Sequence, residues 1–180
     1  LFDVPLHYNF YNASKDLNYD MSKILENTLV KENPCMAVTF VDNHDTQPGQ
    51  ALESFIESWF KPIAYSIILL RNEGYPCVFY GDYYGMPYKN IEPQKYLKDM
   101  MFVRKERAYG IEHDYFDHNK YIGWTLEGDL EHEKSSVAVV ISTSEDGFKR
   151  MYVGTQNVGE TYIDIMGNSD EKIVIDESGC

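Results

Sequence analysis

Four polar residues, Asp42, Asn43, His44 and Asp45, directly follow a run of strand-forming residues and precede a Pro-Gly turn. Carboxylates, amides and imidazoles are groups that transfer protons, bind hydroxyl groups or bind metals. Three roles are therefore open for this cluster: part of an active site, a hydrogen-bonded structural turn, or a metal site. The metal site is the least favoured, because adjacent His and Asp need further ligands and no spacing in the sequence supplies them.

The elements around this cluster are those of an α/β protein. Residues 35–41 (CMAVTFV) form a continuous apolar run, which is typical of a strand buried on both faces of a parallel sheet. Apolar residues then recur at helical spacing over residues 52–68, with a kink or a new helix start expected at Pro62. His44 and Asp45 thus fall just past the carboxyl end of a strand, which is the edge where such sheets build ligand sites.

The alternation of strands and helices continues on both sides of this unit and changes near residue 110. Further strands are predicted at 1–6 and 76–82, and further helices at 20–30 and 93–110. Five short strands separated by Gly, Asn, Asp and Ser clusters are predicted at 121–128, 135–143, 149–154, 161–167 and 171–177. We therefore predict an α/β domain at 1–110 and an antiparallel β domain at 111–180. Because three parallel strands complete neither a barrel nor an open sheet, we expect the protein to extend before Leu1.

The composition narrows the classes of partner. Sixteen basic residues against 29 acidic ones give a net charge of −13, which argues against nucleic acid and anionic membranes as partners. No apolar run approaches the roughly 20 residues of a membrane span. The three cysteines, Cys35, Cys77 and Cys180, are odd in number and far apart, so they favour a reducing compartment such as the cytoplasm over a disulfide framework.

Segments in order along nearly the whole chain resemble the α-amylases of glycoside hydrolase family 13, specifically the bacterial liquefying type and its intracellular relatives. FVDNHD is similar to the conserved block at the end of the seventh strand of that family's barrel. LFDVPLHYNFYNAS resembles the sixth strand, VFYGD the eighth, and AYGIEHDYFDH with IGWTLEGD the join to a C-terminal β domain. The resemblance implies a partial TIM (β/α)8 barrel, comprising its last three strands, followed by an antiparallel β domain.

The resemblance also implies a role for each residue of the cluster. Family 13 α-amylases cleave with retention by means of a nucleophile, an acid/base and a third carboxylate. Asp45 matches the third carboxylate, which is expected to stabilise the oxocarbenium-like transition state. His44 is expected to donate hydrogen bonds to the same sugar. Asn43 and Gln47 complete the expected substrate-binding set, although both also belong to a turn that redirects the chain.

The remaining parts of such an active site are expected outside this chain. The family's nucleophile and acid/base lie before its sixth strand, so the chain alone is expected to be inactive. Calcium is expected in the complete enzyme, with its ligands outside this chain and no metal site within it. The cluster from His113 to His118 is expected to be a structural join, because the next residues are Asn119 and Lys120 and an ammonium group repels a cation.

Two other functions stay open at the level of sequence. One is a non-catalytic carbohydrate-binding module that uses the β domain and exposed aromatic residues. The other is a related family 13 transglycosylase or maltogenic enzyme, whose distinguishing loops would lie upstream. The expected partners are an α-glucan, such as starch, glycogen or maltodextrin, and the missing N-terminal part of the same protein.

Overall fold

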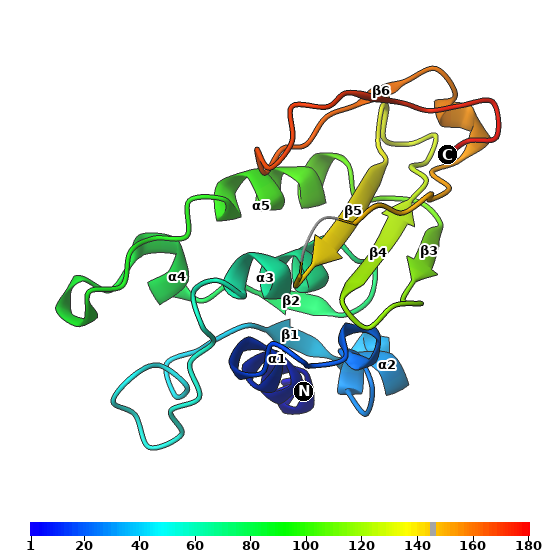
Figure 1. Cartoon of the computed structure of the whole chain (residues 1–180). Helices are drawn as coiled ribbons and strands as arrows, with labels where there is room; N and C mark the ends of the chain where they lie inside the picture. The colour runs from blue at the N-terminus through cyan, green and yellow to red at the C-terminus, as the bar shows by residue number, and fades with distance from the viewer. Residues whose placement is uncertain (145–146) are drawn as a thin grey trace.

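The structure is a computed structural model that describes residues 1–144 and 147–180, and it shows a mixed α/β chain (Figure 1). The helices are α1 (Val4–Lys15), α2 (Leu29–Glu32), α3 (Lys61–Leu69), α4 (Tyr80–Tyr84) and α5 (Leu97–Glu106), with 3-10 turns η1 (Met21–Lys23), η2 (Pro34–Met36), η3 (Pro87–Lys89) and η4 (Thr155–Asn157). The strands are β1 (Val38–Phe40), β2 (Tyr75–Cys77), β3 (Glu112–Tyr115), β4 (Tyr121–Leu126), β5 (Val137–Ser142), β6 (Thr161–Tyr162) and β7 (Ile173–Val174). Within the described ranges, no helix is long and apolar enough to cross a membrane.

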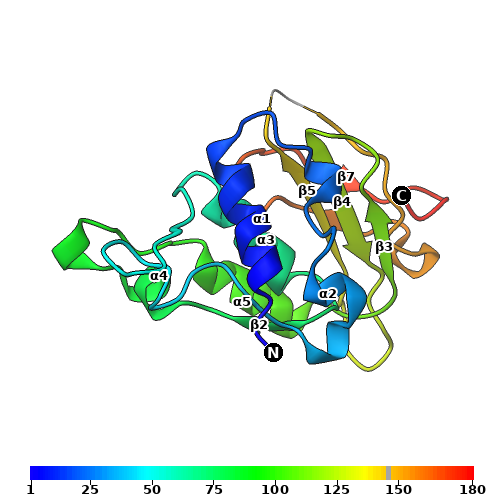
Figure 2. The ribbon, with the colours of Figure 1, turned by 90° about the horizontal axis from the view of Figure 1, so that it is seen from below.

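The N-terminal part is built on a small parallel sheet. Strands β1 and β2 pair in parallel, with Val38 opposite Tyr75, and a parallel bridge joins Phe2 to the other side of Val38. Helix α1 lies on one side of these strands, whereas α3 and α5 lie on the other (Figures 1 and 2). This is the layered α/β arrangement that the sequence predicts, but the described residues form no closed barrel.

The predicted strand at residues 1–6 is wrong, since only Phe2 pairs with β1 and helix α1 begins at Val4. Asp3 caps that helix, because its carboxylate accepts a hydrogen bond from the backbone N–H of Leu6 at 3.1 Å. Pro5 lies in the first turn, where its missing N–H costs nothing. The cap and the proline therefore override the apolar pattern of the segment.

All three predicted helices are shorter than their predicted ranges, and the one predicted at 93–110 is limited to α5. The pattern at 20–30 is interrupted by Asn27, whose φ of 57° is left-handed and separates η1 from α2. The pattern at 52–68 becomes helical only at Lys61, and Pro62 occupies the first turn of α3. Ile56 and Phe60 are buried although they precede the helix. The periodicity of this segment therefore predicts its burial correctly but not its backbone conformation.

The C-terminal part contains the antiparallel sheet β3–β4–β5, in which Trp124 lies opposite Asp114 and Val139. Strands β4 and β5 confirm the predictions at 121–128 and 135–143. The segment at 149–154 forms no strand, and those at 161–167 and 171–177 reduce to the short pair β6 and β7. Strand β3 was not predicted because its sequence, EHDY, is polar.

A shared core and a buried arginine join the two parts. The core includes residues on both sides of position 110, and the Trp124 indole, which is fully buried, donates a hydrogen bond to the Leu70 carbonyl at 2.7 Å. Arg71 follows at the end of α3 and forms ion pairs with Asp114 and Glu112 of β3, each at 2.5 Å. The cluster from His113 to His118, which the sequence predicts to be a structural join, therefore contacts the N-terminal part through Asp114.

Candidate active-site turn after strand β1

The polar cluster forms a turn immediately after β1, and Asn43 shapes it. The Asn43 side-chain oxygen accepts hydrogen bonds from the backbone N–H groups of Asp45 at 2.8 Å and Thr46 at 3.0 Å. In return, the Thr46 hydroxyl oxygen accepts a hydrogen bond from the Asn43 backbone N–H at 3.0 Å. Asn and Thr side chains stabilise turns by such local bonds. The backbone that carries His44 and Asp45 is therefore fixed from both sides.

His44 and Asp45 are brought together on the outside of this turn. Their side chains are 82% and 56% exposed, and Nε2 of His44 lies 3.5 Å from a carboxylate oxygen of Asp45. Gln47, the other predicted binding residue, uses its side-chain N–H to donate to the His44 carbonyl at 3.0 Å. A carboxylate and an imidazole are thus presented to solvent from a rigid support, while Asn43 and Gln47 use part of their amide groups to build it.

Directly beneath the turn, Asp42 is buried in a charged network that the sequence did not reveal. One carboxylate oxygen accepts a hydrogen bond from the Thr46 hydroxyl at 3.0 Å, and the other lies 2.9 Å from the Lys61 ammonium. Lys61 also pairs with Asp82, which follows β2, and the Tyr65 hydroxyl donates to Asp82 at 2.6 Å. The Lys61, Asp42 and Asp82 side chains have no exposed surface.

This network holds two buried carboxylates around one ammonium group. Burial raises the pKa of Asp42 to about 7; the charge and hydrogen bond of Lys61 partly offset this, and nearby Asp82 adds to it. Burial, together with the charge of Asp82, raises the pKa of the Tyr65 hydroxyl as well, so this group remains a donor. The carboxyl beneath the turn therefore titrates near neutral pH.

The raised pKa of Asp42 predicts a pH-dependent contribution to stability. Between about pH 4 and pH 7 the folded state holds a proton that the unfolded state has released, so this contribution falls as pH rises and is level above pH 7. We expect Asp42→Asn, which cannot titrate, to gain stability relative to the wild type between pH 5 and pH 7, by at most about 1.4 kcal/mol per pH unit. Urea unfolding at the two pH values measures the change, and parallel curves would contradict it.

The other acids near the turn have different partners. Glu53 accepts a hydrogen bond from the Gly49 backbone N–H at 2.6 Å, Glu57 pairs with Lys15, and Asp82 is fully buried. None of the three forms a second exposed carboxylate paired with Asp45. Retaining glycoside hydrolysis needs two carboxyl groups flanking the scissile bond. Asp45 and His44 can bind hydroxyl groups and stabilise positive charge, but alone they cannot complete that reaction.

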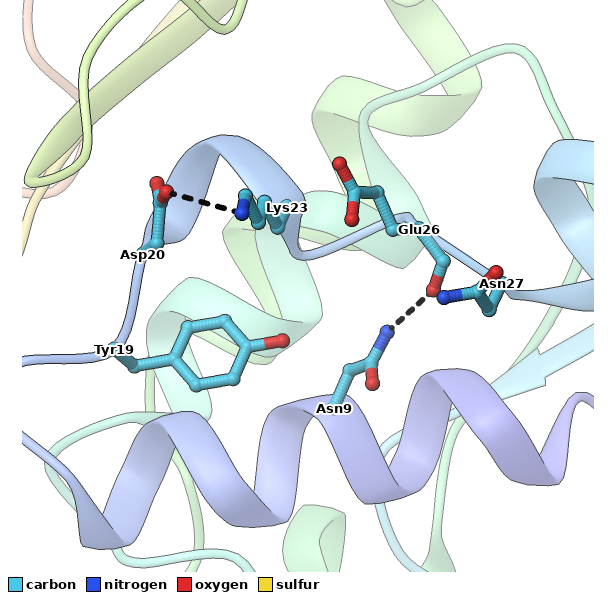
Figure 3. Close-up of a pocket in the computed structure, with 6 residues that line it drawn as sticks. All are labelled: Asn9, Tyr19, Asp20, Lys23, Glu26 and Asn27. Carbon is cyan, nitrogen blue, oxygen red and sulfur yellow. Dashed lines mark hydrogen bonds and ion pairs between the residues drawn. The ribbon is translucent and has the colours of Figure 1, made fainter.

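A polar pocket of about 220 Å³ lies away from this turn, where the loop around η1 crosses helix α1 (Figure 3). Asn9 bridges the two by donating to the carbonyls of Ile24 at 2.9 Å and Glu26 at 3.1 Å. Asp20, also on the pocket wall, accepts hydrogen bonds from both the backbone and the hydroxyl of Ser22. These groups hold the loop in place. Across residues 1–144 and 147–180, no group of three or more His, Cys, Asp or Glu side chains is arranged to hold a metal ion.

Among the residues that shape this site, Lys61 is the one that sequence reasoning missed. It lies within the apolar stretch Trp59-Phe60-Lys61-Pro62-Ile63, where a lysine is usually assigned to the solvent face. The sequence did contain one signal, because position 61 falls at the helical spacing of the apolar residues that are expected to be buried. A charge at such a position requires a buried partner.

The N-terminal part of this mixed α/β chain presents a carboxylate and an imidazole past the end of a strand of its parallel sheet, which is the edge where such sheets build ligand sites. The chain is 52% identical over 184 residues to the α-amylase of Bacillus licheniformis and 51% identical over 181 residues to that of Geobacillus stearothermophilus. It is 41% identical over 191 residues to the cytoplasmic α-amylase of Escherichia coli strain K12. These matches cover 99% of this chain, so the chain is homologous over its whole length to a section of proteins named α-amylases.

The matches cover only part of each relative. The chain spans 36% of the B. licheniformis protein, 33% of the G. stearothermophilus protein and 38% of the E. coli protein, or about a third of their length. The matched part is the C-terminal one. No family model matches the chain. The relationship thus confirms the resemblance of the sequence to liquefying and intracellular α-amylases, and it applies to a section of such proteins.

Proposed function

We propose that this chain is the C-terminal section of an endo-acting α-amylase that hydrolyses α-1,4-glucosidic bonds in starch, glycogen or maltodextrin with retention. The observation that carries the proposal is the exposed pair of Asp45 and His44 on a turn held by Asn43 and Thr46 at the end of β1. The identity of 51% and 52% to proteins named α-amylases supports it.

In this proposal, the chain contributes the last part of a (β/α)8 barrel. The parallel order of Phe2, β1 and β2, with helices on both sides, is compatible with three adjacent barrel strands. Residues 1–110 would belong to the barrel and residues 111–180 to an incomplete β-sandwich-like domain. The remaining strands would come from the N-terminal part of the same protein, which is the first partner that we propose for this chain.

Asp45 is the proposed transition-state stabiliser. Its carboxylate faces solvent on a fixed turn, so it can accept hydrogen bonds from sugar hydroxyls and oppose the positive charge that develops at the anomeric carbon. His44 would donate to the same sugar, and the amide groups of Asn43 and Gln47 not used in the turn would add contacts to the α-glucan. The nucleophile and acid/base would be supplied by the N-terminal part.

Calcium, where the complete enzyme binds it, would be held by residues outside this chain. The described residues offer no cluster of carboxylate or imidazole ligands, and Lys120 donates its ammonium to the Leu17 carbonyl beside the loop that contains Tyr19. A fixed ammonium group at that place opposes cation binding. The three cysteines are free, which favours a reducing compartment for the complete protein.

The proposal predicts that the complete protein hydrolyses α-glucans and that this chain alone does not. On a chromogenic, end-blocked maltooligosaccharide, the complete protein should release internal fragments whose new ends are α-anomers, as measured by the change in optical rotation. The 180-residue chain alone should give no turnover above a heat-inactivated control. Turnover by the chain alone would refute the assignment of the nucleophile and acid/base to the missing part.

Two outcomes of this assay would favour the other functions. A complete protein that binds starch in affinity electrophoresis without cleaving it would indicate a carbohydrate-binding module. A complete protein whose products are longer than the supplied oligosaccharide would indicate a transglycosylase, because sugar rather than water then accepts the glycosyl group. Product chromatography over time distinguishes both from hydrolysis.

A further inference from the structure

Lys61 carries an ammonium group that is fully buried on the first turn of α3. It lies 2.9 Å from a carboxylate oxygen of Asp42, contacts Asp82, and sits 3.6 Å from the centre of the Phe55 ring. Such a group is expensive to bury, because removing two or three charges from water costs about as much as their mutual attraction returns. An all-apolar set of side chains in place of Lys61, Asp42 and Asp82 would fill this space at no loss of stability, so stability alone gives little reason for an ion network here.

The position of Lys61 in the fold suggests a different purpose. Asp42 lies just past the end of β1 and Asp82 lies in α4, the short helix that comes after β2, so the ammonium group ties the end of β1 to the segment that follows the adjacent parallel strand. Tyr65, one turn further along α3, donates to the second oxygen of Asp82 at 2.6 Å. Residues of one helix, α3, therefore hold both the end of β1 and helix α4.

A chain of hydrogen bonds leads from Lys61 to the exposed pair. The Asp42 carboxylate held by Lys61 accepts from the Thr46 hydroxyl at 3.0 Å, and the Thr46 hydroxyl oxygen accepts from the Asn43 backbone N–H at 3.0 Å. His44 and Asp45 lie between Asn43 and Thr46 in the sequence. Every bond in this chain involves a buried or half-buried group, so water does not readily replace it.

We propose that Lys61 is a positioning residue, which acts through Asp42 and Thr46 to hold the turn that presents His44 and Asp45 to the substrate. The inference rests on the proposed function, because it assumes that Asp45 acts on the sugar at the cleavage point. Lys61 itself touches no substrate. Its loss would leave two buried carboxylates without a counter-ion, and the turn above Asp42 would lose its support.

The expected effect is on catalysis more than on binding. A displacement of a catalytic group by about 1 Å costs on the order of 100-fold in rate. In the proposed function, a long α-glucan would also contact the N-terminal part of the complete protein, and those contacts would be unchanged. We therefore expect Lys61→Met in the complete protein to lower kcat about 100-fold and to change KM by less than about threefold. Lys98→Met, at an exposed site on α5, is the matched control and should keep normal kinetics.

Because Lys61→Met removes a buried charge, it can prevent folding, and a second variant is needed. Thr46→Val preserves the shape of the side chain and the ion pairs of Lys61, but removes both hydrogen bonds between the network and the turn. We expect it to fold with a moderately lower melting temperature, because the Asp42 carboxylate and the Asn43 N–H each lose one partner, and to lower kcat at least about tenfold, again with little change in KM. If Thr46→Val keeps kcat within twofold of the wild type, the positioning role of Lys61 is wrong, whether or not Lys61→Met folds.

Measuring Asp45→Asn in parallel separates this inference from the proposed function. If Asp45→Asn retains normal activity, the proposed role of the turn fails and the inference fails with it. If Asp45→Asn is inactive while folded Lys61→Met and Thr46→Val retain normal kcat, only the positioning role fails. Low kcat in all three folded variants, with normal kinetics for Lys98→Met, is the result that we expect.

Discussion

Asp45→Asn in the complete protein is expected to lower kcat by at least about 10³-fold, because the variant keeps the shape of the side chain but loses the negative charge that faces the developing oxocarbenium ion. The Asp45 side chain is 56% exposed and lies on the solvent side of its turn. The hydrogen bonds that fix the turn run from the backbone N–H groups of Asp45 and Thr46 to the Asn43 side-chain oxygen, and the substitution retains both. Folding should therefore be almost unaffected, and single-turnover kinetics with a chromogenic maltooligosaccharide should show the loss in the chemical step.

A matched control for this variant is Asp170→Asn, which removes the same charge from an exposed position in the C-terminal part. The control should have wild-type kinetics, which excludes an effect of net charge alone. Equal melting temperatures for the two variants would show that both fold. A kcat for Asp45→Asn close to that of the control would mean that this carboxylate does not stabilise the transition state.

The location of the polar turn that carries the candidate site was predictable, because it depends on a local change in the sequence. The apolar residues before Asp42 can only be covered by sheet and helices, and the polar residues after it can only lie at the sheet edge. The pairing of His44 with Asp45 follows from their adjacency. The hydrogen bonds of Asn43 to the turn follow from the known preference of Asn for such bonds.

The support beneath the site was not predictable in the same way, because it depends on contacts between distant segments. Lys61, Asp42 and Asp82 come together only when α3 packs against both β1 and β2. No local pattern records that packing. A lysine in an apolar stretch shows only that one buried partner must exist, and the chain offers 29 acidic residues from which to choose.

The C-terminal part shows a second limit of local patterns. Residues 149–154 alternate like a strand, and Met151 and Val153 are indeed buried. Their backbone nevertheless pairs with an irregular segment, since the Val153 N–H donates to the Gly179 carbonyl at 2.8 Å. Alternation therefore indicates which side chains face the core, whereas the identity of the backbone partner decides whether a strand forms.

Arg71→Ala is expected to lower the free energy of unfolding of the chain by about 3 kcal/mol, which is the lower part of the range for breaking a buried ion pair. The Arg71 side chain is only 4% exposed, and its guanidinium pairs with Asp114 and Glu112. It also lies 5.3 Å and 5.5 Å from the ring centres of Phe116 and Trp124. The substitution leaves Glu112, 13% exposed, without its counter-ion and opens a void beside the Trp124 indole. Asp114, 40% exposed, can be rehydrated, which is why the lower value applies.

Urea unfolding followed by tryptophan fluorescence measures this change, since Trp124 packs directly at the junction. The matched control is Arg150→Ala, which removes an arginine that is 63% exposed and paired with an exposed Asp176. Water and salt screen that pair, so its loss should leave the midpoint almost unchanged. Equal midpoints for the two variants would show that Arg71 adds little to the attachment of the β sheet to α3. A lower midpoint for Arg71→Ala only would show that the buried arginine joins the two parts.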